Sequence, residues 1–181
     1  MLKEISEILL SEEAIDKRVR ELAAALTQEY RGKKPVFVGI LKGSFVFMAD
    51  LVRRIETECE VAFMVVSSYG SGTESSGNIT IRKDLEMDVS GRHIILVEDI
   101  VDSGMTLSYL KKYLSNRNAA SVKVCSFLDK PSRRKTELVP DYYGYEIPDA
   151  FVVGYGLDYD ELYRNLPYVG ILKAEVYSNP Q

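Results

Sequence analysis

The unit that decides the fold is the stretch Ile94-Ile95-Leu96-Val97-Glu98-Asp99-Ile100-Val101-Asp102-Ser103-Gly104-Met105-Thr106. Its first four residues are apolar, which is typical of a strand covered on both faces in a parallel sheet. Two acids, Glu98 and Asp99, come after that run, and residues 106–114 carry leucines at helical spacing. The stretch therefore predicts a buried strand, an acidic loop and a helix, which together form the repeating unit of an α/β protein.

The same unit recurs along the chain. Apolar runs predict further strands at residues 36–41, 61–67, 122–128 and 151–155. A helix is expected after Ser11, whose hydroxyl can cap it, and another around residues 48–55. These alternations predict a doubly wound, mainly parallel central sheet flanked by helices, in a single domain of residues 1–181. Ligands of such sheets bind at the carboxyl ends of the strands, near the switch in strand order.

The composition is that of a globular protein in a reducing compartment. The chain is 46% hydrophobic and 28% charged, and its formal charge of −4 disfavours a surface for nucleic acid or an anionic membrane. Cys59 and Cys125 have no CxxC spacing, so we expect free thiols rather than a disulfide. Acidic residues stand where a signal peptide would be basic and then apolar. These features predict a cytoplasmic protein.

Residues 69–78 differ in composition from the predicted strands around them. They contain three glycines and almost no apolar side chain. A loop of this length is often functional, and we expect a lid, although a plain surface loop has the same composition.

Residues 102–106 have the chemistry of an anion-binding loop. Gly104 permits close backbone approach, Ser103 and Thr106 offer hydroxyls, and the start of a helix offers free N–H groups. Acids beside a phosphate site are explained if the ligand also carries vicinal hydroxyls or brings Mg²⁺. The alternative is that Asp99 and Asp102 only cap the loop and the helix. Three acids around one such loop favour a sugar-phosphate ligand.

Residues 97–106 resemble the phosphoribosyl-pyrophosphate motif of the type I phosphoribosyltransferases. Further matches make the chain similar, from about residue 36 to residue 173, to the hypoxanthine-guanine phosphoribosyltransferase family. These matches are Leu41-Lys42-Gly43-Ser44, Ser67-Ser68-Tyr69-Gly70, Asp129-Lys130-Pro131, the segment 148–159 and Arg164. The ten-residue motif is shared by the whole superfamily, whereas Lys130 and Asp158 are specific to enzymes acting on 6-oxopurines.

The resemblance implies how the phosphoribosyl donor is bound. Glu98 and Asp99 would hold the ribose hydroxyls, directly or through Mg²⁺ and water. The 5-phosphate would be bound by Ser103, Gly104, Met105 and Thr106. Pyrophosphate would meet Lys42, Gly43 and Arg164, in a turn that often contains a non-proline cis peptide in this family. The metal ligands would be Glu98, Asp99 and, for a second Mg²⁺, Asp158.

The resemblance also implies how the purine is bound, through a segment of about residues 129–170. Lys130 would donate to the 6-oxo group, which rejects adenine because adenine presents a donor there. The remaining purine contacts would come from Phe151, Val152, Leu157 and Asp158. Asp102 would exchange a proton with purine N7. A small hood region would cover the site, and a lid of about residues 68–80, including Ser68 and Tyr69, would exclude water.

The implied activity is a purine salvage reaction. Phosphoribosyl pyrophosphate and hypoxanthine or guanine would give IMP or GMP and pyrophosphate, in a homodimer or homotetramer that binds neither nucleic acid nor membrane. One alternative is a regulator of the same fold that binds RNA or DNA. Another is a phosphoribosyltransferase for adenine or a pyrimidine. We assign His93 a structural role, and we interpret Arg133-Arg134-Lys135 as a solvated loop.

Overall fold

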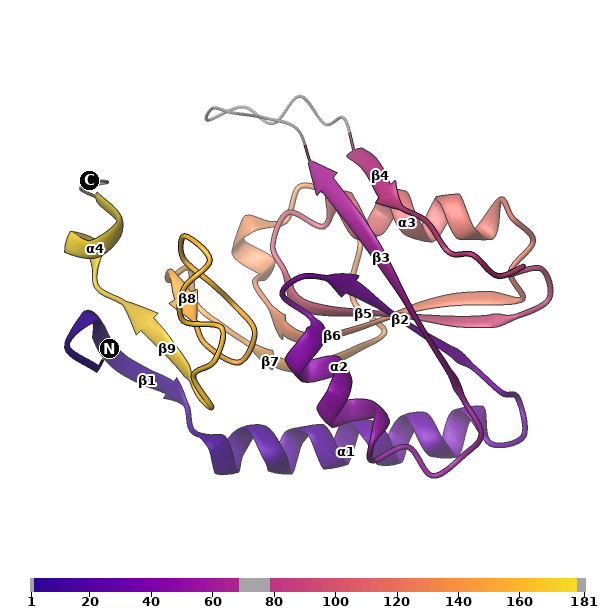
Figure 1. Cartoon of the computed structure of the whole chain (residues 1–181), viewed down its shortest axis with the longest axis horizontal. Helices are drawn as coiled ribbons and strands as arrows, with labels where there is room; N and C mark the ends of the chain where they lie inside the picture. Colours follow the sequence, from indigo (N-terminus) through magenta and orange to yellow (C-terminus); the bar gives the residue numbers. More distant parts are fainter. Residues whose placement is uncertain (1, 69–78, 179–181) are drawn as a thin grey trace.

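Two β-sheets form the protein, which is described here from a computed structural model that places residues 2–68 and 79–178 (Figure 1). The strands of the larger sheet are β2 (Val36–Leu41), β3 (Glu60–Ser68), β4 (Ile79–Lys83), β5 (His93–Val101), β6 (Ser121–Asp129) and β7 (Tyr142–Glu146). They lie in the order β4-β3-β2-β5-β6-β7, and all neighbours are parallel except β3 and β4. The predicted doubly wound, mainly parallel sheet is confirmed.

Helices cover both faces of the larger sheet. These are α1 (Glu12–Tyr30), α2 (Phe45–Val52) and α3 (Met105–Ser115). Alternate strand residues separate the two cores: Phe37 and Ile95 pack with α1 and α2, whereas Val38 and Leu96 pack with α3. The apolar runs of β2, β5 and β6 are therefore buried on both faces, as expected for a covered parallel sheet. Within the described residues, no helix has the length and apolarity needed to cross a membrane.

The first helix begins where the sequence predicts. The Ser11 hydroxyl accepts a hydrogen bond from the Ala14 N–H at 3.2 Å and caps the helix. Ile15, Leu22 and Leu26 form part of the buried stripe. The helix ends at Tyr30, two residues before Gly32, which has a φ of +75°.

A smaller antiparallel sheet forms a hood beside the larger one, at the left of Figure 1. Its strands are β1 (Ile5–Leu10), β9 (Val169–Leu172) and β8 (Val152–Val153), in that order. The short helices η1 (Leu2–Glu4) and α4 (Ala174–Ser178) flank it. A small core of its own holds the hood together; its buried members are Val153, Tyr163, Leu166 and Leu172.

The predicted strand at residues 151–155 is wrong in length and in place. Only Val152–Val153 is a strand, and it pairs with β9 in the hood rather than with the larger sheet. Gly154, Tyr155 and Gly156 have φ values of +95°, +52° and +99°, so the chain turns sharply there and cannot extend. The last strand of the larger sheet is β7 instead.

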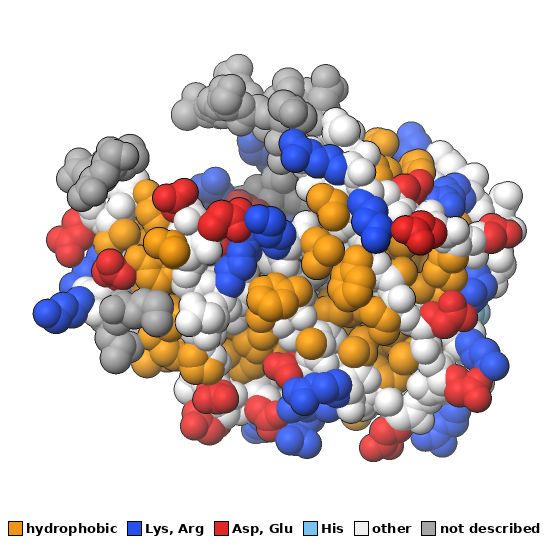
Figure 2. All heavy atoms as spheres, in the orientation of Figure 1, with side chains coloured by type: hydrophobic (Ala, Val, Ile, Leu, Met, Phe, Trp, Pro, Cys, Tyr) orange, Lys and Arg blue, Asp and Glu red, His pale blue; other side chains and the backbone are white. Residues whose placement is uncertain are grey.

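The strand β3 is less covered than its uniform apolar sequence suggests. Met64 is fully buried, whereas Val61 and Phe63 expose 48% and 37% of their surface. Figure 2 shows hydrophobic side chains gathered on this side of the molecule, over β3 and the neighbouring α2. The side chains of Val61 and Phe63, with the exposed Phe45 of α2, are called the β3 patch below.

Both cysteines and the single histidine behave as the sequence predicts. Cys59 and Cys125 are free thiols, and burial raises the pKa of the Cys125 thiol. The His93 Nδ1 atom lies 2.8 Å from the Ser121 hydroxyl, and its ring packs edge-on against Tyr30. These contacts tie the start of β5 to β6 and to the end of α1, in agreement with a structural role.

Candidate active site

The strand order switches between β2 and β5, and the site forms at their carboxyl ends. From β2 the chain continues to α2 and β3 on one side, and from β5 it continues to α3 and β6 on the other. The pairing of β2 with β5 stops at Gly39 and Val97, whereas β5 stays paired with β6 as far as Val101. Beyond Val97, one edge of β5 is therefore free of strand pairing and available to a ligand.

Glu98 and Asp99 lie within β5 and not in a loop after it. We predicted that the strand ends at Val97, but pairing of Glu98 with Ser126 and of Val101 with Asp129 extends it. A rigid strand thus carries both acids. Asp99 also contacts the turn after β2, because a Cβ built on Gly43 would lie only 1.7 Å from Asp99 Oδ2. Gly43 leaves the space that this carboxyl group needs.

The electrostatics of the two acids favour a bound donor or cation. Burial and the neighbouring Asp99 raise the pKa of Glu98 well above its ordinary range. Burial raises the pKa of Asp99 from 3.8 to about 6, against smaller opposing effects of the hydrogen bond from the Ile100 N–H and of Arg164. Two adjacent desolvated carboxyl groups gain most from a partner that donates hydrogen bonds or carries positive charge. A ribose diol and Mg²⁺ both meet that requirement.

The loop after β5 forms a small cavity at the start of α3. The cavity has a volume of about 110 Å³, and the residues lining it include Asp102, Ser103, Gly104 and Thr106. Gly104 has a φ of +78°, and a Cβ there would come within 2.6 Å of the Thr136 hydroxyl. Met105 is the first residue of α3, and its N–H donates to the Ser103 hydroxyl at 3.3 Å. The geometry is that of an anion site at a helix start.

The turn after β2, which contacts Asp99, also meets the hood. The peptide bond between Leu41 and Lys42 is cis. Lys42 Nζ lies 2.9 Å from Glu161 Oε2, and Arg164 Nη2 lies 2.9 Å from Asp158 Oδ1. The backbones also touch, since a Cβ on Gly156 would lie 2.2 Å from Gly43 O. Two cations from distant parts of the chain therefore lie on this side of the site.

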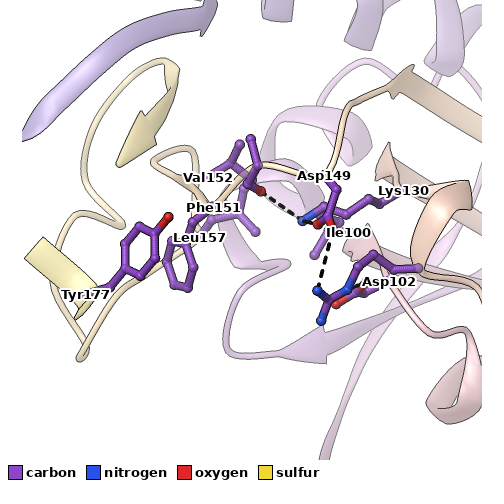
Figure 3. Close-up of a pocket in the computed structure, with 10 residues that line it drawn as sticks. Ile100, Asp102, Lys130, Asp149, Phe151, Val152, Leu157 and Tyr177 are labelled. Atoms are coloured by element: carbon purple, nitrogen blue, oxygen red, sulfur yellow. Dashed lines mark hydrogen bonds and ion pairs between the residues drawn. The ribbon is translucent and has the colours of Figure 1, made fainter. Parts of the chain in front are cut away.

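A second cavity, of about 410 Å³, lies between the end of β6 and the hood (Figure 3). The residues lining it are Ile100, Asp102, Lys130, Arg133, Asp149, Ala150, Phe151, Val152, Leu157 and Tyr177. In Figure 3 the polar groups of Asp102, Lys130 and Asp149 lie on one side, and Phe151, Leu157 and Tyr177 lie on the other. The cavity thus combines an apolar wall with a few polar groups, the usual composition of a site for a flat organic ligand.

Lys130 is held in place as a donor within this cavity. Its side chain is almost buried, and Nζ donates to Ala150 O at 2.9 Å and lies 3.7 Å from Asp149 Oδ1. Asp102 projects toward the same cavity, and its buried Oδ1 lies 3.3 Å from Arg133 Nε without accepting a hydrogen bond from any described residue. An ammonium donor and a carboxylate acceptor therefore face one cavity.

Asp158 is the predicted purine-binding residue that does not line this cavity. Its carboxyl group binds Arg164 and accepts the Glu161 N–H at 2.9 Å. The structure therefore brings Asp158 to the side of the site that holds Lys42 and Arg164.

The interpretation of residues 133–135 as a solvated loop fits Arg133 and Lys135, which are exposed, but is wrong for Arg134. Arg133, in the short helix η2 (Pro131–Arg133), lines the second cavity. Arg134 is nearly buried: its Nε donates to Asp102 O at 3.1 Å, and its other nitrogens bind Leu138 O and Asp129 Oδ1. The loop that carries Asp102 is thereby tied to the end of β6. Three adjacent basic residues give no indication of such pairing in the sequence.

Tyr177 was not anticipated at all. It comes from α4 and stacks on Phe151, with 4.8 Å between ring centroids and 20° between the planes (Figure 3). The sequence distance of 26 residues and the absence of a motif around Tyr177 leave no pattern that would place it there. Of the predicted lid, Ser68 ends β3, and Tyr69 with residues 70–78 lies outside the described residues.

Comparisons with known proteins show which family the chain belongs to. The family described as phosphoribosyl transferase domain matches residues 6–160. The chain is 54% identical over 179 residues to the hypoxanthine-guanine phosphoribosyltransferase of Bacillus subtilis strain 168, with 99% of each chain covered. The enzyme of that name from Streptococcus pneumoniae R6 is 53% identical, with 97% of this chain and 98% of the relative covered. A crystal structure of a hypoxanthine phosphoribosyltransferase from Staphylococcus aureus superposes with a TM-score of 0.96 at 51% identity, covering 99% of this chain and 97% of that one.

Proposed function

The chain belongs to the hypoxanthine-guanine phosphoribosyltransferase family, and from this membership we propose how its two cavities divide the reaction between them. The reaction is purine salvage: the 5-phosphoribosyl group of phosphoribosyl pyrophosphate is transferred to N9 of hypoxanthine or guanine. IMP or GMP forms and pyrophosphate leaves. The proposals below concern the residues, the metal and the assembly.

One observation carries the assignment of the site: Ile100 and Asp102 line both cavities. The bond between the purine and the sugar forms where the base site meets the sugar-phosphate site. The 110 Å³ cavity at residues 103–106 suits the 5-phosphate, with N–H groups, two hydroxyls and a helix start. The 410 Å³ cavity suits the purine. Asp102 then stands beside the reacting atoms.

The purine cavity has the donors and the wall that a 6-oxopurine needs. Lys130 has three N–H donors and two protein partners, so one donor is available to the 6-oxo oxygen. Phe151 exposes 39% of its surface and supports stacking, while Val152 and Leu157 complete the wall. Adenine would place an amino donor opposite the Lys130 donor, and polar sites discriminate strongly against such a mismatch.

Asp102 is proposed as the proton carrier. As N9 of the purine bonds to C1 of the ribose and the bond from C1 to pyrophosphate breaks, N7 loses its proton. A carboxylate facing the base can accept that proton, and it returns the proton in the reverse reaction. Arg134 holds the backbone of this loop through the Asp102 carbonyl, which keeps the carboxyl group in position.

Lys42, Gly43 and Arg164 are proposed to bind the leaving pyrophosphate. Negative charge builds up on that group as the C1 bond breaks, and fixed cations stabilise it. Glu98 and Asp99 would hold the ribose hydroxyls. Positive charge develops on the sugar at the same time, and the two carboxyl groups favour it electrostatically.

Magnesium fits this donor set as a metal that arrives with the substrate. Within residues 2–68 and 79–178, no three His, Cys, Asp or Glu side chains cluster as a preformed metal site. Mg²⁺ commonly binds through one or two carboxylates together with substrate phosphate oxygens and water. Glu98, Asp99 and Asp158 are the residues that would hold it. When bound, the metal would neutralise charge on the pyrophosphate group.

A homodimer or a homotetramer is proposed as the working assembly. The β3 patch is an apolar surface on a sheet that a second copy of the chain can cover, and contiguous exposed apolar surface commonly marks such contacts. The two free cysteines suit the reducing cytoplasm, which we propose as the site of action.

Two alternatives make different predictions. A nucleic-acid-binding regulator of this fold has no need of Asp102 and Lys130 in one cavity. An enzyme for adenine would be hindered by the Lys130 donor, and a pyrimidine has no N7 with which Asp102 could exchange a proton. Purified protein with Mg²⁺ and phosphoribosyl pyrophosphate should be offered hypoxanthine, guanine, xanthine, adenine, orotate and uracil separately. We expect turnover with hypoxanthine, guanine or both. No turnover of any 6-oxopurine would contradict the proposal.

A further inference from the structure

A tight turn presents Glu161 to the two cations on the pyrophosphate side of the site. The Tyr159 and Leu162 backbones exchange hydrogen bonds of 3.2 and 3.0 Å, so residues 159–162 form a two-residue hairpin turn. Its central residues, Asp160 and Glu161, have φ values of +50° and +63°. Asn-Gly is the favoured pair for this geometry. Aspartate tolerates a positive φ fairly well, whereas a longer side chain such as glutamate does so less readily.

The Glu161 carboxylate touches both cations with one oxygen. Its Oε2 atom lies 2.9 Å from Lys42 Nζ and 3.4 Å from Arg164 Nη2. The hydrogen bond from Lys42 lowers the pKa of the Glu161 carboxyl group, which is therefore ionised at neutral pH. A carboxylate thus stands against the two side chains that are assigned to an incoming anion.

The ion pair between Glu161 and Lys42 offsets part of the conformational energy that the positive φ of Glu161 costs, but this ion pair is weak. Non-glycine residues at positive φ cost conformational energy and often mark functional positions. The Lys42 and Glu161 side chains are 67% and 63% exposed, and exposed ion pairs contribute little stability. A multiply charged anion with several oxygens can displace one such carboxylate.

We propose that Glu161 is an internal anion that occupies Lys42 and Arg164 until the pyrophosphate group displaces it. The inference rests on the proposed assignment of Lys42 and Arg164 to pyrophosphate. Glu161 then lowers the affinity for pyrophosphate and for the donor substrate, because each must compete with it for the same cations. Release of the product pyrophosphate is favoured for the same reason.

A positioning role of Glu161 would change the affinity for pyrophosphate in the opposite direction. If Glu161 only orients Lys42 for binding, its removal should weaken the binding of pyrophosphate. Glu161→Gln keeps the size of the side chain and removes its charge. Asp160→Asn is a matched control, because it removes the same charge from the neighbouring position of the same turn, where no described contact to Lys42 or Arg164 exists.

The experiment is calorimetric titration of the full-length enzyme with magnesium pyrophosphate at low and high salt. We expect Glu161→Gln to bind about 2–5-fold more tightly than the unmodified enzyme at low salt, the range expected for loss of one exposed ion pair. The gain should shrink at high salt, and Asp160→Asn should bind like the unmodified enzyme.

Unchanged or weaker binding by Glu161→Gln overturns the inference, as does an equal gain in Asp160→Asn. Lys42→Met separates this failure from failure of the proposed function. If Lys42→Met binds pyrophosphate as well as the unmodified enzyme, the assignment of Lys42 is wrong and the inference falls with it. If Lys42→Met binds more weakly but Glu161→Gln is unchanged, only the internal anion is wrong.

Discussion

Asp102 lines both the 110 Å³ cavity proposed for phosphate and the 410 Å³ cavity proposed for the purine. Replacing it by asparagine keeps the shape and removes the proton acceptor. We expect Asp102→Asn to lower kcat by roughly 10²–10⁴-fold, with KM values within a few-fold, since general acid–base catalysis contributes about that much. Steady-state kinetics with hypoxanthine test this. Asp149→Asn, a carboxyl change in the same cavity, is the control, and an undiminished kcat in Asp102→Asn would remove the residue from this role.

We propose that Lys130 determines which purine is accepted, so its replacement should change the preference for the base. Lys130→Met removes the donor and retains the length of the side chain. We expect kcat/KM for hypoxanthine to fall about 10–100-fold, the range for one hydrogen bond to a charged group, while that for adenine changes less. The exposed neighbour Lys135 supplies the control Lys135→Met. Equal losses with both bases would show that Lys130 does not read position 6.

Asp99 should make the metal-free protein less stable above pH 6. Its pKa is 3.8 ordinarily and about 6 in the folded protein because of burial, so the folded protein retains a proton that the unfolded chain has lost. Stability therefore falls as pH rises from 3.8 to about 6 and stays lower above that range. Asp99→Asn removes this effect. Its gain in unfolding free energy should be on the order of 1–2 kcal/mol at pH 8 and smaller near pH 4.

Urea denaturation in EDTA at the two pH values measures this difference. An equal gain in unfolding free energy at both pH values would show that the Asp99 carboxylate is not destabilised by burial. The variant should at the same time bind phosphoribosyl pyrophosphate more weakly, because it has lost part of the charge proposed for the ribose and the metal.

At the scale of elements, the strands of the larger sheet differ in how well the sequence predicts them. The apolar runs at β2, β5 and β6 are buried on both faces, and their positions follow from the pattern alone. The end of β5 does not follow from the pattern, because its last four residues are held by pairing with β6 on one side only. Pairing depends on tertiary structure, so an acidic stretch within a strand looks like a loop in the sequence.

The hood is the part that local pattern could not predict. The run at residues 151–155 has the composition of a strand, but three consecutive positive φ values at residues 154–156 shorten it. Val152 pairs with Ile171 of β9, which is 19 residues further along the chain. The resemblance to a known family, and not periodicity, placed Phe151 and Leu157 in the site. Tyr177 and Arg134 were missed because only the folded chain brings them there.

The helix α4 should contribute to purine affinity through Tyr177. This side chain stacks on Phe151 and lines the purine cavity. We expect Tyr177→Ala to raise KM for hypoxanthine about 2–10-fold, the range for one aromatic pair, and to leave KM for phosphoribosyl pyrophosphate unchanged. Tyr177→Phe should retain affinity. Val176→Ala in the same helix is the control, and an equal rise there would mean that only the placement of α4 matters.

At the scale of the whole molecule, the β3 patch predicts self-association. Val61 lies on the exposed side of β3 with Phe63, and Val61→Glu would place a charge in an apolar interface. Light scattering after size-exclusion chromatography should show a dimer or tetramer for the unmodified protein and a smaller species for Val61→Glu. Val139→Glu, at another exposed valine, should leave the mass unchanged. A monomeric unmodified protein would contradict the predicted assembly.

The division of the molecule into a larger sheet and a hood explains why the proposed active site lies between them. The larger sheet supplies the phosphate loop and Asp102, and the hood supplies Phe151, Val152 and Leu157. The contact of Gly43 with Gly156 brings the two parts together beside the pyrophosphate cations. Neither part alone would form the complete site that is proposed for a purine nucleotide.

A crystal structure of the enzyme with GMP tests this account most directly. We predict that the 5-phosphate lies against Ser103–Thr106, that the base stacks on Phe151, and that its 6-oxo oxygen accepts a hydrogen bond from Lys130. Asp102 should lie within hydrogen-bond distance of N7. A nucleotide bound with its base outside the cavity between Lys130 and Phe151, or with its phosphate away from residues 103–106, would contradict the account.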